Sequence, residues 1–339
     1  MVINSELDNE VLGDPIFICG YPKSGTTLLA SLLDGHSECL VVPEETKFFK
    51  KVILQNHEDR FDYLFFHTNI SVLRKDIVDE PSGIRDYTKI DFSILYELSK
   101  KYWRQSEKSN IDLLESLVYG FANATKNVSY KYWVEKTPLN ENYLDVMQQY
   151  WKKSKAILII RDPRQTFCSH REYQHKKKQP SKIMIANFVA RWKEGIRSFV
   201  HFLKNGGTGI IIRYEELVND TEAVMKKVAH FIGVSYENNL LYPTRAGTSW
   251  SGNSAFNEND FNKVTPRSEN YLDNLTKNEI QYIEYHLSEL MHQNGYAPNF
   301  NKPSMLSVHA IYYDLHPKFN KIKRLIFVRL PQFLKKIFI

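Results

Sequence analysis

The 339-residue sequence contains few cysteines and no long hydrophobic run. Its three cysteines, Cys19, Cys39 and Cys168, are far apart in the chain. This spacing argues against a disulfide framework and a cysteine-rich zinc site, and it favours a reducing compartment. No run reaches 18 apolar residues, and residues 1–15 lack the basic and apolar regions of a signal peptide. We therefore expect a cytoplasmic protein without a transmembrane helix.

The sequence also lacks a strong charge imbalance. Its 45 Lys and Arg residues and 39 Asp and Glu residues give a net charge of +6. This mild excess favours anionic ligands but does not indicate nucleic acid, so we expect no nucleic-acid partner. Hydrophobic residues make up 42% of the chain, which is enough for a sizeable core and typical of a globular enzyme. The composition points to no particular oligomeric state.

Short apolar runs that alternate with helical patterns predict an α/β fold. The first strand is predicted at residues 15–20; leucines at helical spacing follow, and then a second strand at 39–42. Residues 156–160 are five consecutive apolar residues, as expected for a parallel strand buried on both faces. A similar run ends at Arg213. We predict a P-loop-like central parallel sheet flanked by helices.

Two segments differ from this pattern. Residues 50–130 are rich in charged and aromatic residues and contain helical patterns, for example at 92–103 and 111–124. We interpret them as a helical, acceptor-binding insertion in a single domain that spans residues 1–339. The tail at 305–339 is basic and apolar. Two interpretations of it stay open: a terminal helix packed on the core, or a segment that contacts a membrane surface.

A turn suited to phosphate follows the first predicted strand. It reads GYPKSGTT from Gly20, with four residues between its two glycines and a helix directly after it. Backbone N–H groups and the helix dipole converge on an anion in such a turn. In an ATP-binding loop, lysine follows the second glycine and precedes the Ser or Thr that holds Mg²⁺. Here Lys23 precedes Gly25, and Thr26 and Thr27 follow it, so we expect no metal ion.

A second candidate anion site follows the strand at 156–160. Arg161 ends that strand, and Asp162 with Pro163 predicts the start of a helix. Ser169 lies eight residues beyond Arg161, about two helical turns into this helix. A forked guanidinium and a hydroxyl at this spacing suit a shared phosphate. A surface salt bridge is the alternative for Arg161.

These motifs resemble those of the sulfotransferases that use 3′-phosphoadenosine-5′-phosphosulfate (PAPS). The resemblance covers about residues 15–34, 133–173, 210–234 and 247–295 and is weak over 50–130. It implies that the turn binds the 5′-phosphosulfate, that the Arg–Ser pair binds the 3′-phosphate, and that a late loop covers the nucleotide. The nucleotide-binding residues that it implies are Pro22, Lys23, Ser24, Gly25, Thr26, Thr27, Arg161, Ser169, Tyr214, Asn253 and Ser254.

Two further motifs resemble catalytic segments of sulfotransferases. "PEETKFF" is similar to the Glu-Glu-Thr segment of tyrosylprotein sulfotransferases, whose second glutamate acts as a base, which implies Glu45. Glu44 stays open, because this chain has one more residue before the pair. "VEKTP" is similar to a segment of glycosaminoglycan sulfotransferases and implies that Lys136 approaches the sulfuryl group. A helix cap at the glutamates and a surface salt bridge at Glu135 and Lys136 are the alternatives.

The resemblance implies a metal-independent sulfotransferase that moves the sulfuryl group of PAPS to a hydroxyl and releases adenosine 3′,5′-bisphosphate. Lys23 would bridge the leaving phosphate and the sulfuryl group. Two rival functions are a P-loop kinase and a non-catalytic nucleotide-binding protein. The position of Lys23 disfavours the first, and the intact set of Lys23, Glu45, Arg161 and Ser169 disfavours the second.

The expected acceptor is a carbohydrate or glycolipid hydroxyl, with a tyrosine, another phenol or a small metabolite as the alternative. Aromatic side chains with cationic neighbours follow Glu45 in the sequence and suit sugar rings or phenols. The same side chains would otherwise form the core of the insertion. They are Phe48, Phe49, Phe61, Tyr63, Phe65, Phe66, His67 and Tyr87.

Overall fold

The computed structural model describes residues 12–80, 83–176, 185–250 and 271–300. The chain divides into two compact units. The first contains residues up to Arg161 and Gly195–Arg267, and the second contains Asp162–Glu194 and the residues from Ser268 onward. A single domain over residues 1–339 stays a prediction.

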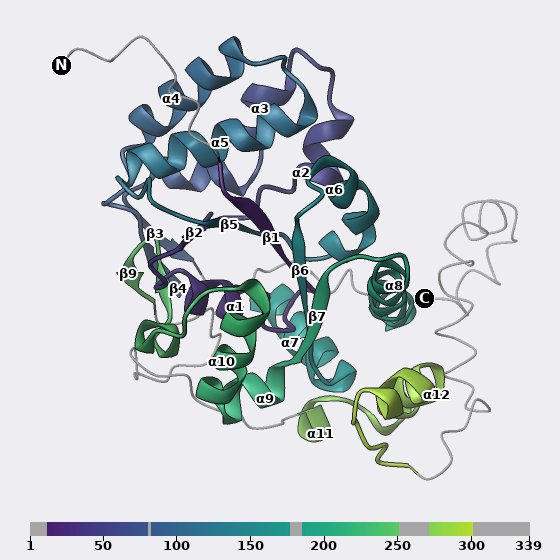
Figure 1. The fold of residues 1–339 in the computed structure, drawn as a ribbon. Helices are drawn as coiled ribbons and strands as arrows, with labels where there is room; N and C mark the ends of the chain where they lie inside the picture. The colour runs from purple at the N-terminus through teal and green to yellow at the C-terminus, as the bar shows by residue number, and fades with distance from the viewer. Residues whose placement is uncertain (1–11, 81–82, 177–184, 251–270, 301–339) are drawn as a thin grey trace, which may run out of the picture. The chain divides into compact units, whose positions relative to one another are not determined.

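A five-stranded parallel sheet forms the centre of the first unit (Figure 1). Its order is β2-β5-β1-β6-β7, and every neighbouring pair is parallel. The predicted parallel sheet is therefore confirmed, and the strands predicted at 15–20, 39–42 and 156–160 agree with the structure to within one residue at each end. The strands are β1 (Asp14–Cys19), β2 (Cys39–Val41), β5 (Tyr132–Lys136), β6 (Lys155–Ile160) and β7 (Gly209–Arg213).

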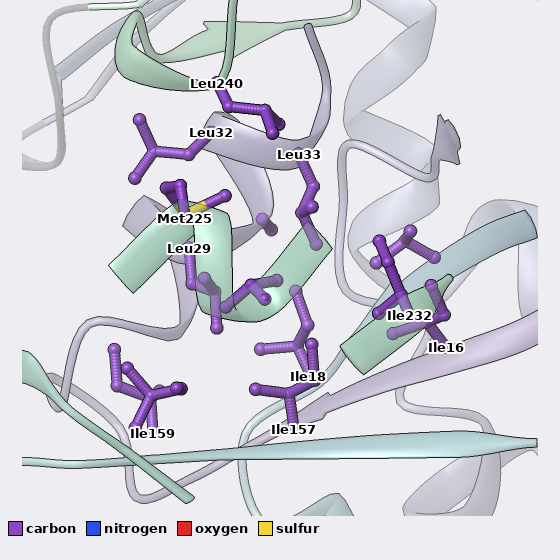
Figure 2. Close-up of a cluster of buried hydrophobic side chains, with 14 of the residues drawn as sticks. Ile16, Ile18, Leu29, Leu32, Leu33, Ile157, Ile159, Met225, Ile232 and Leu240 are labelled. Atoms are coloured by element: carbon purple, nitrogen blue, oxygen red, sulfur yellow. The ribbon is translucent and has the colours of Figure 1, made fainter. Parts of the chain in front are cut away.

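The two faces of the sheet are packed differently, because successive side chains of a strand point to opposite faces. Ile16 and Ile18 of β1 belong to an aliphatic cluster with Leu29 and Met225, which come from helices α1 (Thr26–Leu33) and α10 (Thr221–Ile232) (Figure 2). Phe17, between the two isoleucines, contacts an aromatic group instead, with ring centroids 5.7–6.3 Å apart. That group consists of Phe49, Trp133 and Trp151.

The segment at 50–130 is largely helical. The helical patterns at 92–103 and 111–124 are confirmed as α4 (Phe92–Gln105) and α5 (Asn110–Ala124), which begin at the side-chain caps Asp91 and Ser109. Sequence analysis missed a hairpin within the segment, which the structure forms from β3 (Ile77–Glu80) and β4 (Gly83–Asp86). Helices α2 (Phe48–Lys51) and α3 (Arg60–Phe66) precede this hairpin, and α6 (Leu144–Tyr150) follows β5.

Later segments complete the first unit. Helix α9 (Tyr214–Asn219) follows β7 directly and packs against α10, beneath α1 in Figure 1. Residues 244–249 form the small hairpin of β8 (Thr244–Arg245) and β9 (Thr248–Ser249). This hairpin carries Arg245 into the protein interior.

The second unit is helical in its described part. It contains α7 (Pro163–Lys176), α11 (Tyr271–Asn274), α12 (Lys277–Gln293) and the first half of α8 (Ile185–Lys204), which continues into the first unit. The predicted helix start at Pro163 is confirmed. A buried Arg164 contacts Asp162 at 2.6 Å and Glu284 at 2.5 Å, which holds this unit together.

Some predictions fall on other residues. The tail at 305–339 and the residues Asn253 and Ser254 lie outside the described residues. Within the described ranges, no helix combines the length and the hydrophobicity needed to cross a membrane.

Candidate active site

The turn between β1 and α1 has the backbone expected of an anion loop. Gly20, Lys23 and Gly25 have φ values of 142°, 75° and 106°, a left-handed region that favours glycine. Ser24 is buried and closes the turn, because its backbone N–H and its hydroxyl both donate to the carbonyl of Tyr21, at 3.0 and 2.7 Å. Gly25 is the N-cap of α1, and it offers no side chain to the first-turn N–H groups. These groups suit an anionic ligand.

Tyr214 and Arg161 both contact this loop. A Cβ atom on Gly25 would lie 2.5 Å from a ring carbon of Tyr214, so only glycine allows the two segments to approach so closely. The Arg161 guanidinium lies over the same ring, 4.3 Å from its centroid. Arg161 Nη1 also donates to the carbonyl of Lys23 at 3.3 Å. The structure therefore brings together Arg161, Tyr214 and the loop, which are far apart in the sequence.

The other predicted nucleotide-binding residues have a different status. Ser169 lies on α7 in the second unit, is half-buried, and accepts a hydrogen bond from Gln165 Nε2 at 3.4 Å. Its convergence with Arg161 on one phosphate stays a prediction, as do the roles of Asn253 and Ser254. Pro22 and Thr27 are half-buried in the loop, and Thr26 is buried at the start of α1.

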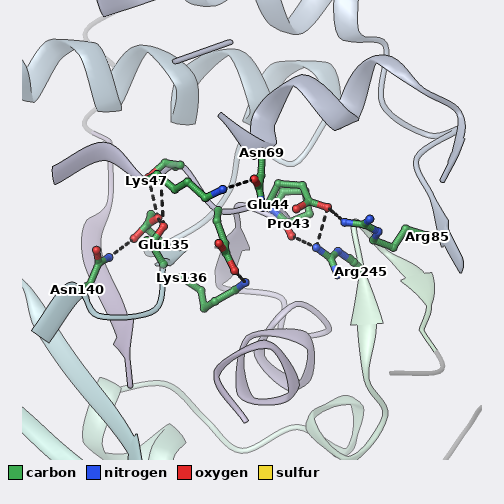
Figure 3. A network of polar contacts seen from close by, with 12 residues as sticks. Pro43, Glu44, Lys47, Asn69, Arg85, Glu135, Lys136, Asn140 and Arg245 are labelled. Atoms are coloured by element: carbon green, nitrogen blue, oxygen red, sulfur yellow. Dashed lines mark hydrogen bonds and ion pairs between the residues drawn. The ribbon is translucent and has the colours of Figure 1, made fainter. Parts of the chain in front are cut away.

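Glu44 is buried, and one oxygen of its carboxylate accepts several hydrogen bonds (Figure 3). Its Oε1 accepts from Arg85 Nη1 at 2.7 Å, from Arg245 Nη2 at 2.8 Å and from the hydroxyl of Tyr87. Burial, and then the Glu44 charge, raise the pKa of Tyr87, so the phenol keeps its proton and donates it. The two arginines come from β4 and β8, 41 and 201 residues away. Glu44 therefore anchors two hairpins.

Glu45 has a different environment from its neighbour. Its side chain is 25% exposed, and its Oε1 lies 3.2 Å from Lys136 Nζ. Burial alone would raise the pKa of Glu45, but Lys136 and Lys47 outweigh it and hold the pKa below its usual value. Glu45 is thus an ionised carboxylate at neutral pH, and its side chain reaches solvent. Such a group can accept a proton.

A buried carboxylate positions Lys136 and Glu45. Glu135 is 1% exposed and accepts from Thr46 Oγ1 at 2.8 Å, Thr137 Oγ1 at 2.6 Å and Asn140 Nδ2 at 2.6 Å. Burial raises its pKa. Because Thr46 follows Glu45 and Thr137 follows Lys136, Glu135 ties the segment after β2 to the segment after β5. The surface salt bridge considered for Glu135 and Lys136 is therefore wrong: both side chains are buried, and each contacts the segment after β2.

Sequence reasoning missed the residues that hold this site in place. The helix cap considered for the glutamates is also absent, because α2 begins after Lys47, which is its N-cap. Lys47 donates from Nζ to Asn69 Oδ1 at 2.6 Å. The sequence spacing of these contacts gives no signal, because each joins segments far apart in the chain. The residues that the sequence analysis did not single out are Thr46, Arg85, Asn140 and Arg245, and it gave Tyr87 and Glu135 different roles.

Among the described residues, no group of three or more His, Cys, Asp or Glu side chains is placed to hold a metal ion. Metal independence stays a prediction.

Comparisons with known proteins identify relatives of this chain. The model of the sulfotransferase family matches residues 15–238. The putative protein-tyrosine sulfotransferase of Caenorhabditis briggsae is 21% identical over 236 residues, which cover 67% of this chain and 68% of that protein. Protein-tyrosine sulfotransferase 2 of Gallus gallus is 23% identical over 237 residues. This chain spans about half the length of the latter, 53%.

Two solved structures are also similar. The sulfotransferase domain from the curacin biosynthetic pathway has a TM-score of 0.47 and 18% identity, with 85% of this chain and 99% of that chain covered. Mouse sulfotransferase SULT7A1, complexed with PAP, has a TM-score of 0.45 and 16% identity, with 83% and 85% covered. The family match covers more than half of the chain and includes the loop, Glu45, Lys136 and Arg161, so the chain belongs to the sulfotransferase family.

Proposed function

We propose that this chain transfers the sulfuryl group of PAPS to an acceptor hydroxyl and releases adenosine 3′,5′-bisphosphate. One observation carries the proposal. Of two adjacent glutamates, Glu44 is committed to three donors, whereas Glu45 is partly exposed, ionised and 3.2 Å from the amine of Lys136. A base and a cation side by side are what sulfuryl transfer to a hydroxyl requires.

On the donor side, the residues present fit an anionic nucleotide. The loop from Pro22 to Thr27 would hold the 5′-phosphosulfate on backbone N–H groups at the start of α1, where the N-cap Gly25 has no side chain to compete for them. Lys23 would neutralise charge between the phosphate and the sulfuryl group. Arg161 and Ser169 would hold the 3′-phosphate, and Asn253 and Ser254 would cover the nucleotide. Tyr214 would orient Arg161 beneath the loop.

At the reacting centre, Glu45 would take the proton of the acceptor hydroxyl as its oxygen attacks sulfur. An oxygen–sulfur bond to the acceptor forms, and the bond between sulfur and the 5′-phosphate oxygen breaks. Negative charge then accumulates on the leaving phosphate, where Lys23 would stabilise it, and Lys136 would stabilise the transferring group. Removing the Lys136 cation from Glu45 at this stage would raise the basicity of the carboxylate.

The acceptor class is proposed on narrower grounds. We retain a carbohydrate or glycolipid hydroxyl, reached over residues 50–130. Most of the aromatic residues expected to bind it instead form the core: Phe48, Phe49, Phe61, Phe65 and Tyr87 are all buried. Tyr63 and Phe66 are half-buried and His67 is exposed. A tyrosyl hydroxyl is the second candidate, favoured because the named relatives are protein-tyrosine sulfotransferases.

Calorimetric titration tests the donor. We expect adenosine 3′,5′-bisphosphate to bind and ATP to bind much more weakly, with or without Mg²⁺. Lys23→Ala should lower kcat by about a hundredfold or more while much of the nucleotide affinity survives, because Lys23 acts mainly on charge that develops in the transition state. Preference for ATP, or turnover that stops in EDTA and returns with Mg²⁺, would favour a kinase instead.

A labelled-donor assay tests the acceptor. Oligosaccharides, glycolipids, simple phenols and tyrosine peptides are compared at equal hydroxyl concentration. Transfer confined to peptides or phenols would overturn the carbohydrate proposal and leave sulfuryl transfer standing. Binding of adenosine 3′,5′-bisphosphate with no transfer to any acceptor, by protein with an intact Glu45, would favour a non-catalytic nucleotide-binding protein.

A further inference from the structure

Gly20, the first residue of the anion loop, is held at both of its backbone polar groups by one segment. Its N–H donates to Oε2 of Glu141 at 2.9 Å. Its carbonyl accepts from the N–H of Leu139 at 3.1 Å. Both partners lie directly after β5, the strand that ends with Glu135 and Lys136. The anion loop, here also called the donor loop, is therefore hydrogen-bonded to the segment that directly follows Lys136.

The surroundings of Gly20 leave it little freedom. Its φ is 142°, and a Cβ atom there would lie 2.4 Å from the carbonyl oxygen of Ile159 and 2.8 Å from the hydroxyl of Ser24. On the other side, Leu139 has a φ of 73°, in the left-handed region that is uncommon for leucine. The segment after β5 is thus bent into an unfavourable conformation at the residue whose N–H reaches the loop.

Glu141 is an unexpected residue to find behind an anion site. It is 3% exposed, and α8 approaches it at Gly195, where a Cβ atom would lie 2.5 Å from Oε1. A carboxylate there opposes an anion in the loop. Burial raises the pKa of Glu141 to about 7, which reduces its charge at neutral pH. The Glu141 oxygen is needed here to accept the hydrogen bond of Gly20 N–H, whereas a negative charge would repel an anion in the loop.

We infer that Glu141 is a positioning residue of the donor loop: its buried carboxyl oxygen fixes Gly20 and sets the loop at a constant distance from Lys136. This inference rests on the proposed function, because only that function makes the loop a binding site for PAPS. The residue acts through a hydrogen bond and not through its charge. It touches the backbone of the loop and is not itself a catalytic residue.

Two conservative variants separate the hydrogen bond from the charge. Glu141→Gln keeps an acceptor oxygen at the same distance and removes the charge. Glu141→Asp keeps the charge and withdraws the oxygens by about 1.5 Å, beyond hydrogen-bond distance from Gly20. Titrations use adenosine 3′,5′-bisphosphate and inorganic pyrophosphate. We expect E141D to weaken the affinity for both about three- to tenfold and E141Q to retain most of the affinity.

Glu115 provides the matched control. It is a partly buried glutamate of α5 that accepts from Trp151 Nε1 at 2.8 Å, and its carboxyl pKa is also raised, chiefly by burial. Neither E115Q nor E115D should change the affinity for adenosine 3′,5′-bisphosphate by more than about twofold. A loss in E115D equal to that in E141D would mean a general loss of packing and would overturn the inference.

Hydrogen exchange gives a second measurement that needs no ligand. Exchange at the Gly20 amide should be faster in E141D than in wild type and little changed in E141Q, because only the aspartate loses the acceptor. Equal affinity and equal exchange in E141D and wild type would overturn the inference, as would a loss in E141Q as large as that in E141D. If wild type binds neither nucleotide nor pyrophosphate, the proposed function fails, while the exchange data still decide whether Glu141 fixes the loop.

Discussion

Glu44 and Glu45 are adjacent in the chain, yet the structure gives them opposite environments. Glu44 is 1% exposed and bonded to two arginines and a tyrosine, whereas the side chain of Glu45 is 25% exposed and faces Lys136. The first region consists of charges that hold hairpins in place. The second region holds a partly exposed carboxylate beside the amine of Lys136. Residue type alone therefore does not separate an anchor from a candidate base; the partners do.

The difference follows from where each side chain points after β2. The Glu44 carboxylate points to β4 and β8, where it contacts Arg85 and Arg245. The Glu45 carboxylate points to the end of β5. There, Glu135 accepts hydrogen bonds from Thr46 and Thr137. Exchanging or neutralising these charges one at a time should reveal which region supports folding and which supports chemistry.

The largest effect is expected from Glu45→Gln. It removes the proposed base, so kcat should fall by about 10²- to 10⁴-fold. The unfolding free energy should fall by about 1–3 kcal/mol, less than in Glu44→Gln, because the amide still offers an acceptor to the one buried cation, Lys136. Turnover with labelled donor and urea denaturation measure the two quantities. Full activity in this variant would exclude Glu45 as the base.

Glu44→Gln should do the reverse. It leaves the buried guanidiniums of Arg85 and Arg245 without their carboxylate, which costs about 3–5 kcal/mol of stability. Below the unfolding transition, we expect kcat within about tenfold of wild type. Glu237→Gln is the control, because Glu237 is 27% exposed and should cost less than about 1 kcal/mol. A folded E44Q protein with no activity would make Glu44 the better candidate for the base.

Arg245→Met should have a smaller effect on the same cluster. Arg245 donates to Glu44 and to the carbonyl of Pro43 at 2.7 Å, and both acceptors lose this donor. Because Arg85 and Tyr87 still engage Glu44, we expect a loss of about 1–3 kcal/mol, below that of E44Q. Thermal or urea denaturation ranks the two variants. A loss larger than that of E44Q would mean that Arg245, and not Glu44, is the centre of the cluster.

The smallest effect is expected from Lys47→Met, which sharpens the assignment of Glu45. Burial raises the pKa of Glu45, and Lys136 followed by Lys47 lowers it. A base must be ionised, so activity is lost as pH falls through its pKa. Without Lys47 that pKa rises, so the acidic limb of the pH–rate profile should move to higher pH. Lys226→Met, on the exposed side of α10, should leave the limb in place.

Local patterns predicted the sheet and the anion loop well. The apolar run at Ala156–Ile160 and the glycines at positions 20 and 25 follow rules that depend on neighbouring residues: side-chain burial on both faces, and φ values open to glycine. Arg161 and Tyr214 were expected to bind the nucleotide, and their contact with the loop itself was not predicted. The β3–β4 hairpin was missed because the exposed Ile77 and Ile84 give no alternating pattern.

The sequence by itself determined the parallel sheet, the uncapped loop at the start of α1 and the candidate pair Glu44–Glu45. Only the tertiary structure gave the two glutamates different partners and brought Glu141 to Gly20. The physical reason lies in distance along the chain. A turn or a strand depends on residues a few positions apart, whereas the state of a buried carboxyl depends on donors 41, 121 or 201 residues away, which only folding brings into contact.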